Sequence, residues 1–326
     1  MKILQIGLGS MGKRRIRNLQ YLGHNNIIGF DFRKDRSEEA KRLYNIETVD
    51  NLNNIDLSNI THVSISTPPD KHIEYAIWAV ENDKHVFIEA SVVDDNYNDL
   101  LKLSKRKNVV IAPSCTMRFD PLNSKVKSIL ESKVLGKNIF LQHHFGLYLP
   151  YWHPYENIKD FYVSKRETGA AREIVPFDLV YISWFVGLPN DNISGLITKT
   201  NILDIDIDDI YSLQYKTEDN CHVQFTIDVV SKKAYRTTRI VCENGTIELD
   251  TVKGTLAVYY SIEDSWKIYN RAQLSSTKST EEMYILEMEK FIQASQNEAK
   301  WPLSIEVDWS ILKWLYAAEK NNVHKE

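Results

Sequence analysis

Three glycines near the start of the chain have the spacing of a turn that cradles a diphosphate. They are Gly7, Gly9 and Gly12, with Ser10 and Met11 completing the turn. An apolar run precedes the turn and a helical pattern of apolar residues follows it, so strand, turn and helix are all indicated. The first glycine permits the bend, the second admits a pyrophosphate, and the third lets helix and strand pack. The helix N-terminus adds N–H groups that favour an anion. The alternative is a tight junction that binds nothing.

An acidic residue, Asp31, ends the second apolar run, roughly 20 residues after the turn, where a ribose-binding carboxylate is expected. It would accept hydrogen bonds from the adenosine ribose and repel a 2′-phosphate, which predicts NAD rather than NADP. Arg33, with Lys34 and Arg36 close by, is a further cofactor candidate, because a guanidinium can stack on adenine or bind a phosphate. A solvated basic turn is the alternative for these three residues.

Polar residues also follow the strand predicted at residues 63–66. Ligands of open parallel sheets bind outside the carboxyl ends of the strands, so Ser66, Thr67 and Pro68 are cofactor candidates. His72 follows shortly afterwards and is predicted to contact the cofactor, with a cap or core histidine as the alternative.

The elements that must position these residues divide the chain into two predicted domains. Residues 1–118 alternate short apolar strands with amphipathic helices, which predicts an α/β Rossmann-type doubly wound parallel sheet. Residues 119–326 show period-two alternation and two late helices, which predicts an α+β substrate-binding and oligomerisation domain with a mostly antiparallel open sheet. A large apolar sheet face cannot stay exposed to water, and the open face of an antiparallel sheet often becomes a subunit contact, so we expect a homodimer or homotetramer.

Composition excludes several functional classes. The 326 residues are 43% hydrophobic and carry a net charge of −4, which is unlike a nucleic-acid-binding protein. No apolar stretch approaches the ~20 residues of a membrane span, and no targeting segment is evident. Three cysteines fit a reducing compartment without disulfides. We therefore expect a cytoplasmic protein with a small-molecule partner and neither a nucleic acid nor a membrane partner.

The order of these motifs resembles the Gfo/Idh/MocA oxidoreductases. The matching segments are residues 6–14, 66–72, 84–89 and 117–121. The resemblance implies an NAD(P)-dependent oxidoreductase that acts on a sugar, inositol or nucleotide sugar. The aromatic stretch at residues 147–156 is similar to a branch of the family concerned with precursors of surface sugars.

Two catalytic residues of the family are missing from this chain. Members usually read Glu-Lys-Pro where this chain has Glu89-Ala90-Ser91, so the lysine is absent. The family histidine falls on Val175 in one register and on Phe177 in another. Oxidation of an alcohol needs a base for the hydroxyl proton, and none of these replacements supplies one. Either other residues have taken over, or water or the substrate supplies a proton in a reductase, or the protein binds NAD and sugar without turnover as a sensor or partner.

The resemblance and the residue chemistry together nominate four groups for the substrate site: Glu89, His153, Lys165 and Asp178. His153 has the ordinary pKa of a base near neutrality. Lys165 could work with the hydroxyls of Tyr148 and Tyr151.

Some of these residues have alternative roles. Glu89 and Arg118 are also cofactor candidates, and Arg118 would suit a carboxylate or phosphate, or an interdomain ion pair. Asp178 has a helix cap as its alternative.

A metal site is not expected. Asp204, Asp206, Asp208 and Asp209 lack the glycine and glutamate of a calcium loop, so a solvated strand face is predicted instead. His143 and His144 are adjacent and would point to opposite faces of a strand.

Overall fold

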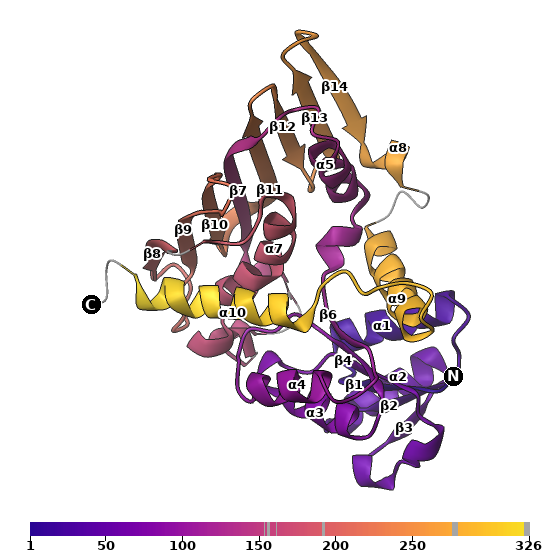
Figure 1. Cartoon of the computed structure of the whole chain (residues 1–326). Coiled ribbons are helices and arrows are strands. Elements are labelled where there is room, and N and C mark those ends of the chain that lie inside the picture. Colours follow the sequence, from indigo (N-terminus) through magenta and orange to yellow (C-terminus); the bar gives the residue numbers. More distant parts are fainter. Residues whose placement is uncertain (153, 155–156, 161, 191–192, 276–279, 323–326) are drawn as a thin grey trace. The chain divides into compact units, whose positions relative to one another are not determined.

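The computed structural model describes residues 1–152, 154, 157–160, 162–190, 193–275 and 280–322. Contacts divide the chain into two compact units (Figure 1). The first contains residues 1–116 and 283–309, and the second contains residues 117–282 and 310–326. Within the described residues, no helix is both long enough and apolar enough to span a bilayer.

A parallel six-stranded sheet forms the centre of the first unit, in the order β3-β2-β1-β4-β5-β6. Its strands are β1 (Ile3–Ile6), β2 (Ile27–Phe30), β3 (Glu47–Val49), β4 (His62–Ile65), β5 (His85–Ile88) and β6 (Ile111–Pro113). The flanking helices are α1 (Ser10–Tyr21), α2 (Lys34–Tyr44), α3 (His72–Glu81), α4 (Tyr97–Ser104) and α9 (Glu281–Ser295). The central strands are buried along their whole length, which explains their unbroken apolar runs. The predicted doubly wound sheet is confirmed.

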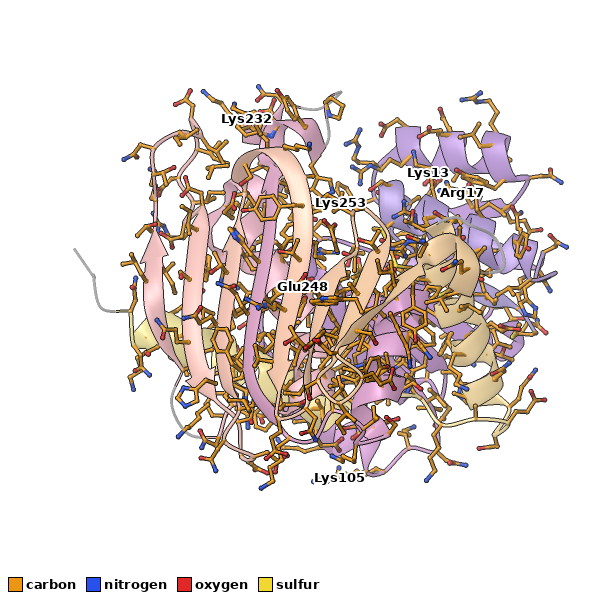
Figure 2. The ribbon with its side chains drawn as sticks, turned by 90° about the horizontal axis from the view of Figure 1, so that it is seen from above. Lys13, Arg17, Lys105, Lys232, Glu248 and Lys253 are labelled. Atoms are coloured by element: carbon orange, nitrogen blue, oxygen red, sulfur yellow. The ribbon has the colours of Figure 1, made fainter. Side chains whose placement is uncertain are left out.

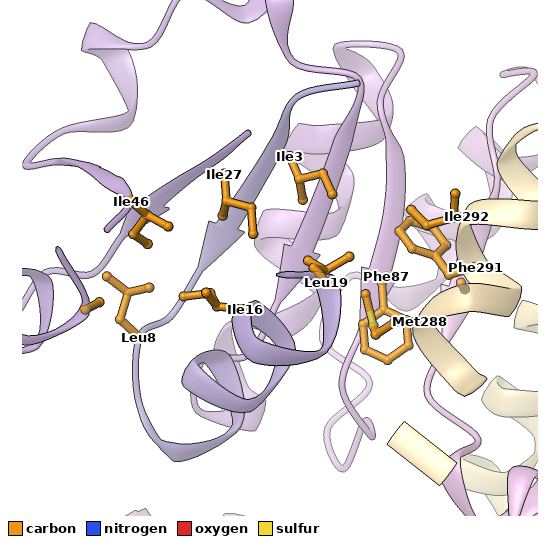
Figure 3. Close-up of a cluster of buried hydrophobic side chains, with 12 residues drawn as sticks. Ile3, Leu8, Ile16, Leu19, Ile27, Ile46, Phe87, Met288, Phe291 and Ile292 are labelled. Atoms are coloured by element: carbon orange, nitrogen blue, oxygen red, sulfur yellow. The ribbon is translucent and has the colours of Figure 1, made fainter. Parts of the chain in front are cut away.

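A buried hydrophobic cluster of the first unit joins segments from both ends of the chain (Figure 3). Ile16 and Leu19 from α1 and Phe87 from β5 share one buried cluster with Met288 and Phe291 from α9. The sequence pattern predicts that residues 119–326 form the second domain, whereas residues 283–309 belong to the first unit. The physical reason is the apolar face of α9, which is buried in the first unit's core.

An eight-stranded sheet dominates the second unit, in the order β14-β13-β12-β11-β7-β10-β9-β8. Its strands are β7 (Asn138–Tyr148), β8 (Ser194–Thr198), β9 (Ile210–Lys216), β10 (His222–Asp228), β11 (Val230–Cys242), β12 (Gly245–Asp250), β13 (Thr255–Tyr260) and β14 (Ser265–Asn270). All pairings are antiparallel except β7 with β10. The predicted mostly antiparallel sheet is therefore confirmed.

Helix α7 (Ala170–Val186) packs on one face of this sheet, beside β9 and β10. The second unit also contains α5 (Pro121–Glu131), α6 (Leu149–Trp152) and α8 (Arg271–Leu274), and α10 (Ile305–Lys320) is divided between the units. Buried residues on β9 and β10, such as Leu213 and Phe225, alternate with outward polar ones.

The outward face of the sheet carries both polar and apolar side chains. Its side chains include Glu248, labelled in Figure 2, together with Gln214, Gln224, Thr226, Thr237 and Arg239. The same face also carries exposed apolar side chains, among them Leu196, Trp266 and Ile268. The expected subunit contact on this face and the oligomeric state both stay predictions.

The acidic segment at residues 204–209 is irregular rather than a strand, which corrects the sequence prediction. Its carboxylates pair with cations from neighbouring loops: Asp204 with Lys159, and Asp206 with both Arg166 and Lys199. The alternation of charges with isoleucines therefore reflects ion pairing and local burial.

Candidate dinucleotide and substrate sites

The glycine turn between β1 and α1 is a close-packed junction that only glycine can form at two positions. Gly7 has φ +87°, and a Cβ there would lie 2.4 Å from the carbonyl oxygen of Ser66. A Cβ on Gly12 would lie 1.9 Å from the carbonyl oxygen of Gly7. A Cβ on Gly9, by contrast, would meet only the side chain of Arg36, at 3.3 Å. Gly9 is thus the position where the backbone can be approached from outside.

Helix α1 begins directly at this turn with Ser10 and Met11. Gly9 is its N-cap and provides no side-chain hydrogen bond to the first turn. The first N–H groups of a helix have no acceptor within the helix, so they can bind a diphosphate. The backbone geometry therefore fits a dinucleotide.

Asp31 lies at the end of β2 with its carboxylate held by the backbone. Its oxygens accept hydrogen bonds from the N–H of Leu8 at 2.8 Å and the N–H of Arg33 at 2.9 Å. The carboxylate is thus fixed against the glycine turn, where a ribose hydroxyl would be recognised.

The guanidinium nearest to Asp31 belongs to Arg36. Its Nη1 lies 3.9 Å from Asp31 Oδ2. The side chain of Arg33 makes a bidentate pair with Asp35 instead. Arg33 stays a predicted cofactor residue, and Arg36, whose guanidinium lies closest to the Cβ position of Gly9, is a second candidate.

The residues after β4 form a hydrogen-bonded edge. Ser66 accepts a hydrogen bond from Gln5 and donates to Glu89 Oε1 at 3.4 Å. His72 is buried, and its Nε2 lies 2.9 Å from the carbonyl oxygen of Thr67. Burial lowers the pKa of His72, which favours a neutral ring that donates to this carbonyl. The His72 ring therefore binds the backbone of the turn that contains Pro68.

Glu89 belongs to a buried ion-pair network within the first unit. Arg15 Nε lies 2.6 Å from Glu89 Oε1, and Arg15 Nη1 lies 2.9 Å from Glu287 Oε2. Arg15 and Glu287 are fully buried, whereas Glu89 keeps 15% of its side chain exposed. Although burial opposes the charge of Arg15, the two carboxylates raise its pKa. Glu287 also accepts hydrogen bonds from Ser114, Thr116 and the N–H of Cys115.

Asp178 lies in the middle of α7, completely buried, and therefore does not cap the helix. Its Oδ2 lies 2.9 Å from His143 Nε2 and 3.2 Å from Arg236 Nε. His143 Nδ1 in turn lies 2.9 Å from Thr238 Oγ1. Burial lowers the pKa of His143, which favours a neutral imidazole that donates to Asp178. The carboxylate is thus held by two side chains from the sheet.

The other predicted substrate residues are spread over the second unit. Arg118 donates to the carbonyl of Val180 at 2.8 Å and lies over the ring of Trp184. Lys165 is exposed. The ammonium over the ring of Tyr148 belongs to Lys232, at 3.2 Å, rather than to Lys165. His153 lies outside the described residues.

Three important partners were missed by sequence reasoning: Arg15, Glu287 and Arg236. Arg15 follows the glycine turn and reads as part of a basic helix surface, while Glu287 interrupts an apolar helical stripe. An acidic residue inside such a stripe was the available signal. No group of three or more histidine, cysteine or acidic side chains that could hold a metal occurs within the described ranges.

The glycine turn, the start of α1 and Asp31 on a parallel sheet define a dinucleotide-binding Rossmann domain. The chain belongs to the Gfo/Idh/MocA family of oxidoreductases. Residues 1–113 match the family model described as an oxidoreductase family with an NAD-binding Rossmann fold, and residues 123–248 match the model of the family's C-terminal domain.

Curated relatives match over parts of their length. Oxidoreductase P35 of Formosa agariphila is 37% identical over 82 residues, which are 24% of this chain and 26% of that protein. Myo-inositol 2-dehydrogenase of Thermotoga maritima is 28% identical over 142 residues, which are 42% of each chain. The chain thus matches less than half the length of either relative.

Solved structures match over nearly the whole chain. A levoglucosan dehydrogenase in complex with NADH and levoglucosan has a TM-score of 0.87 at 16% identity, covering 98% of this chain and 96% of the other. An oxidoreductase from Agrobacterium radiobacter in complex with NAD+, L-tartaric acid and magnesium has a TM-score of 0.85 at 12% identity, covering 98% and 96%. At these identities the likeness establishes the fold.

Proposed function

We propose that this protein is an NAD-dependent oxidoreductase that acts on a hydroxyl of a sugar or nucleotide sugar, in the formation of a surface-glycan precursor. The observation that carries the proposal is the glycine turn, in which Gly9 is open to approach while Asp31 is fixed beside it. The sugar substrate is supported by relatives named for inositol and levoglucosan.

Bound NAD would supply the hydride acceptor. The protein's own residues would bind the NAD and accept the proton of the substrate hydroxyl. The N–H groups at the start of α1 would hold the diphosphate, and Asp31 would receive the ribose hydroxyls. Glu89, with its exposed edge, is a candidate to accept the hydroxyl proton. Asp178 is buried, so we assign it the positioning of Arg236 and His143 rather than direct proton transfer. His153 and Lys165 stay candidates for contact with the sugar.

The proposal is tested by measuring affinity for NADH and NADPH, then following reduced-cofactor absorbance with a panel of sugars and nucleotide sugars in both directions. We expect tighter binding of NADH than NADPH and turnover with at least one sugar. No affinity for either coenzyme would overturn the proposal.

A second candidate function is a non-catalytic NAD- and sugar-binding protein. Ala90 stands where the family carries lysine, and Val175 or Phe177 stands where it carries histidine, so the usual proton-transfer groups are absent. Tight NAD binding without turnover on any sugar would favour this role. Activity created only by Ala90→Lys combined with Val175→His or Phe177→His would also favour it.

We further propose a cytoplasmic homodimer or homotetramer. The three cysteines are buried and form no disulfide with one another, which suits a reducing compartment. Native mass measurement at micromolar concentration tests the assembly, and a monomer would contradict it.

A further inference from the structure

The guanidinium of Arg236 is held rigidly inside the second unit. Arg236 lies on β11, with its guanidinium carbon 4.2 Å from the ring centre of Phe145 and 5.7 Å from that of Phe177. Its Nε lies 3.2 Å from Asp178 Oδ2. Rings and a carboxylate therefore fix the plane of the group.

The terminal nitrogens of Arg236 lack strong acceptors. Nη1 donates to the sulfur of Met117 at 3.4 Å, and a thioether is a weak acceptor. Within the part of the chain that the structure describes, neither terminal nitrogen has an oxygen partner. The side chain is 14% exposed, so the group is mostly buried but can still be reached.

Charge balance alone does not account for this arrangement. Asp178 compensates the positive charge from the Nε side, yet a buried ion pair is stabilising only when its remaining donors are satisfied. The unsatisfied donors form a planar fork that matches a carboxylate or phosphate in a bidentate manner. Water would satisfy single donors, whereas an oxyanion would satisfy the fork and its charge together.

The guanidinium of Arg236 lies next to Phe177. Phe177 is one of the two positions at which the family histidine would fall, and its ring contacts the Arg236 guanidinium. A permanently charged donor group, which cannot act as a base, therefore stands beside that position.

We propose that Arg236 binds an oxyanion on the substrate, so that the sugar oxidised or reduced by this protein carries a carboxylate or a phosphate. This inference rests on the proposed oxidoreductase function and names its substrate class. Nε is buried and faces Asp178 as an ion pair without an aligned hydrogen bond, so the two terminal nitrogens are the donors to the anion.

The test measures binding of glucose, glucuronate, glucose 6-phosphate and inorganic phosphate by calorimetry, in the presence of NADH. At least one charged probe should bind ten times more tightly or better than glucose, and which one does identifies carboxylate or phosphate. Arg236→Gln should weaken charged-probe binding ~10- to 100-fold, since a charge-assisted pair is lost, and change glucose binding little. Arg239→Gln on the same strand, whose side chain is exposed and pairs with Glu248, is the matched control.

Arg236→Gln leaves Asp178 without its cation and could therefore unfold the protein. Two further variants keep the test informative in that case. Arg236→Lys keeps the charge but loses the fork, and should weaken charged-probe binding about 10-fold with the melting temperature retained. Arg236→Met with Asp178→Asn removes both charges together and should abolish the preference for charged probes.

Some outcomes would overturn the inference. They are charged probes binding no better than glucose, no charged probe binding at millimolar concentration, or equal losses for charged and neutral probes in Arg236→Gln. NADH affinity is recorded in every case. If the protein binds NADH but these outcomes occur, only the inference about Arg236 is wrong. If the unmodified protein does not bind NADH, the proposed oxidoreductase function is wrong as well.

Discussion

Arg15 joins two carboxylates that are far apart in the chain, with its Nε 2.6 Å from Glu89 Oε1 and its Nη1 2.9 Å from Glu287 Oε2. One guanidinium on α1 thereby connects the end of β5 to α9, within the first unit. Because Arg15 is fully buried, both carboxylates depend on it for neutralisation.

Arg15→Met should destabilise the protein by about 3–5 kcal/mol, because Glu287 would be left buried without its cation. Chemical unfolding monitored by circular dichroism measures the change. Lys13→Met on the same helix is the control: its pair with Glu39 is partly exposed, so we expect a loss of less than about 1 kcal/mol. A loss of similar size in both variants would contradict the role given to Arg15.

Gly9→Ala and Gly12→Ala should separate cofactor binding from folding. The Gly9 backbone has φ −70°, and a Cβ there meets only the Arg36 side chain. Gly9→Ala should therefore fold normally and bind NADH at least ~10-fold more weakly, since the added methyl occupies the approach to the diphosphate. Gly12→Ala should lose about 1–3 kcal/mol of stability, because its Cβ meets a backbone oxygen. Calorimetry and thermal unfolding check both; unchanged NADH affinity in Gly9→Ala would place the diphosphate elsewhere.

Asp31→Asn should weaken NADH binding ~10- to 100-fold, as expected when hydrogen bonds to a charged acceptor are lost, and should narrow the difference between NADH and NADPH. Titrations with each coenzyme measure both effects. Asp35→Asn is the matched control, because Asp35 is a nearby carboxylate that pairs with Arg33 at the surface. Equal effects of the two substitutions would count against ribose recognition by Asp31.

His62 should make the stability sensitive to acid. Burial lowers the pKa of His62 to about 3, and its ring lies 2.7 Å from Ser295 Oγ and stacks on His85. Its ordinary pKa is near 6.5, so between pH 6.5 and 3 the unfolded chain binds a proton that the folded protein does not. Stability is thus fully present above pH 6.5 and falls as the pH decreases, by about 2 kcal/mol at pH 5 for this group.

His62→Gln should reduce that pH dependence, which urea unfolding at pH 7 and pH 5 measures. His222→Gln, at an exposed position on β10, should leave the dependence as it is in the unmodified protein. If His62→Gln also leaves it unchanged, other buried histidines such as His143 must dominate.

Asp178→Ala should destabilise the protein by about 3–5 kcal/mol, because Arg236 would lose its buried carboxylate. Glu248→Gln, at an exposed pair with Arg239, should cost less than about 1 kcal/mol. If Asp178→Ala abolishes turnover while stability stays unchanged, Asp178 is a catalytic residue and our assignment of a positioning role is wrong.

Local patterns in the sequence were sufficient to predict the first unit's sheet and its glycine turn. Gly7, Gly9, Gly12 and Asp31 lie within one strand–helix–strand segment, so their spacing alone places them at one edge of a parallel sheet. The alternation along β9 and β10 likewise predicted an antiparallel sheet. The composition of its outer face, which combines Gln214 and Glu248 with the exposed Trp266 and Ile268, became clear only in the structure, because period-two alternation identifies two faces without showing which strands neighbour each other.

The sequence by itself therefore determined the fold class, the family resemblance and the dinucleotide turn, since each depends on residues close together in the chain. Only the tertiary structure decided which charges meet: Arg15 with Glu287, Asp178 with Arg236, and Arg36 rather than Arg33 beside Asp31. Ion pairs between distant segments have no periodic signature, and their partners are set by the packing of helices on sheets. The same packing buries Asp178 and leaves the fork of Arg236 accessible, which is a difference that residue type alone cannot reveal.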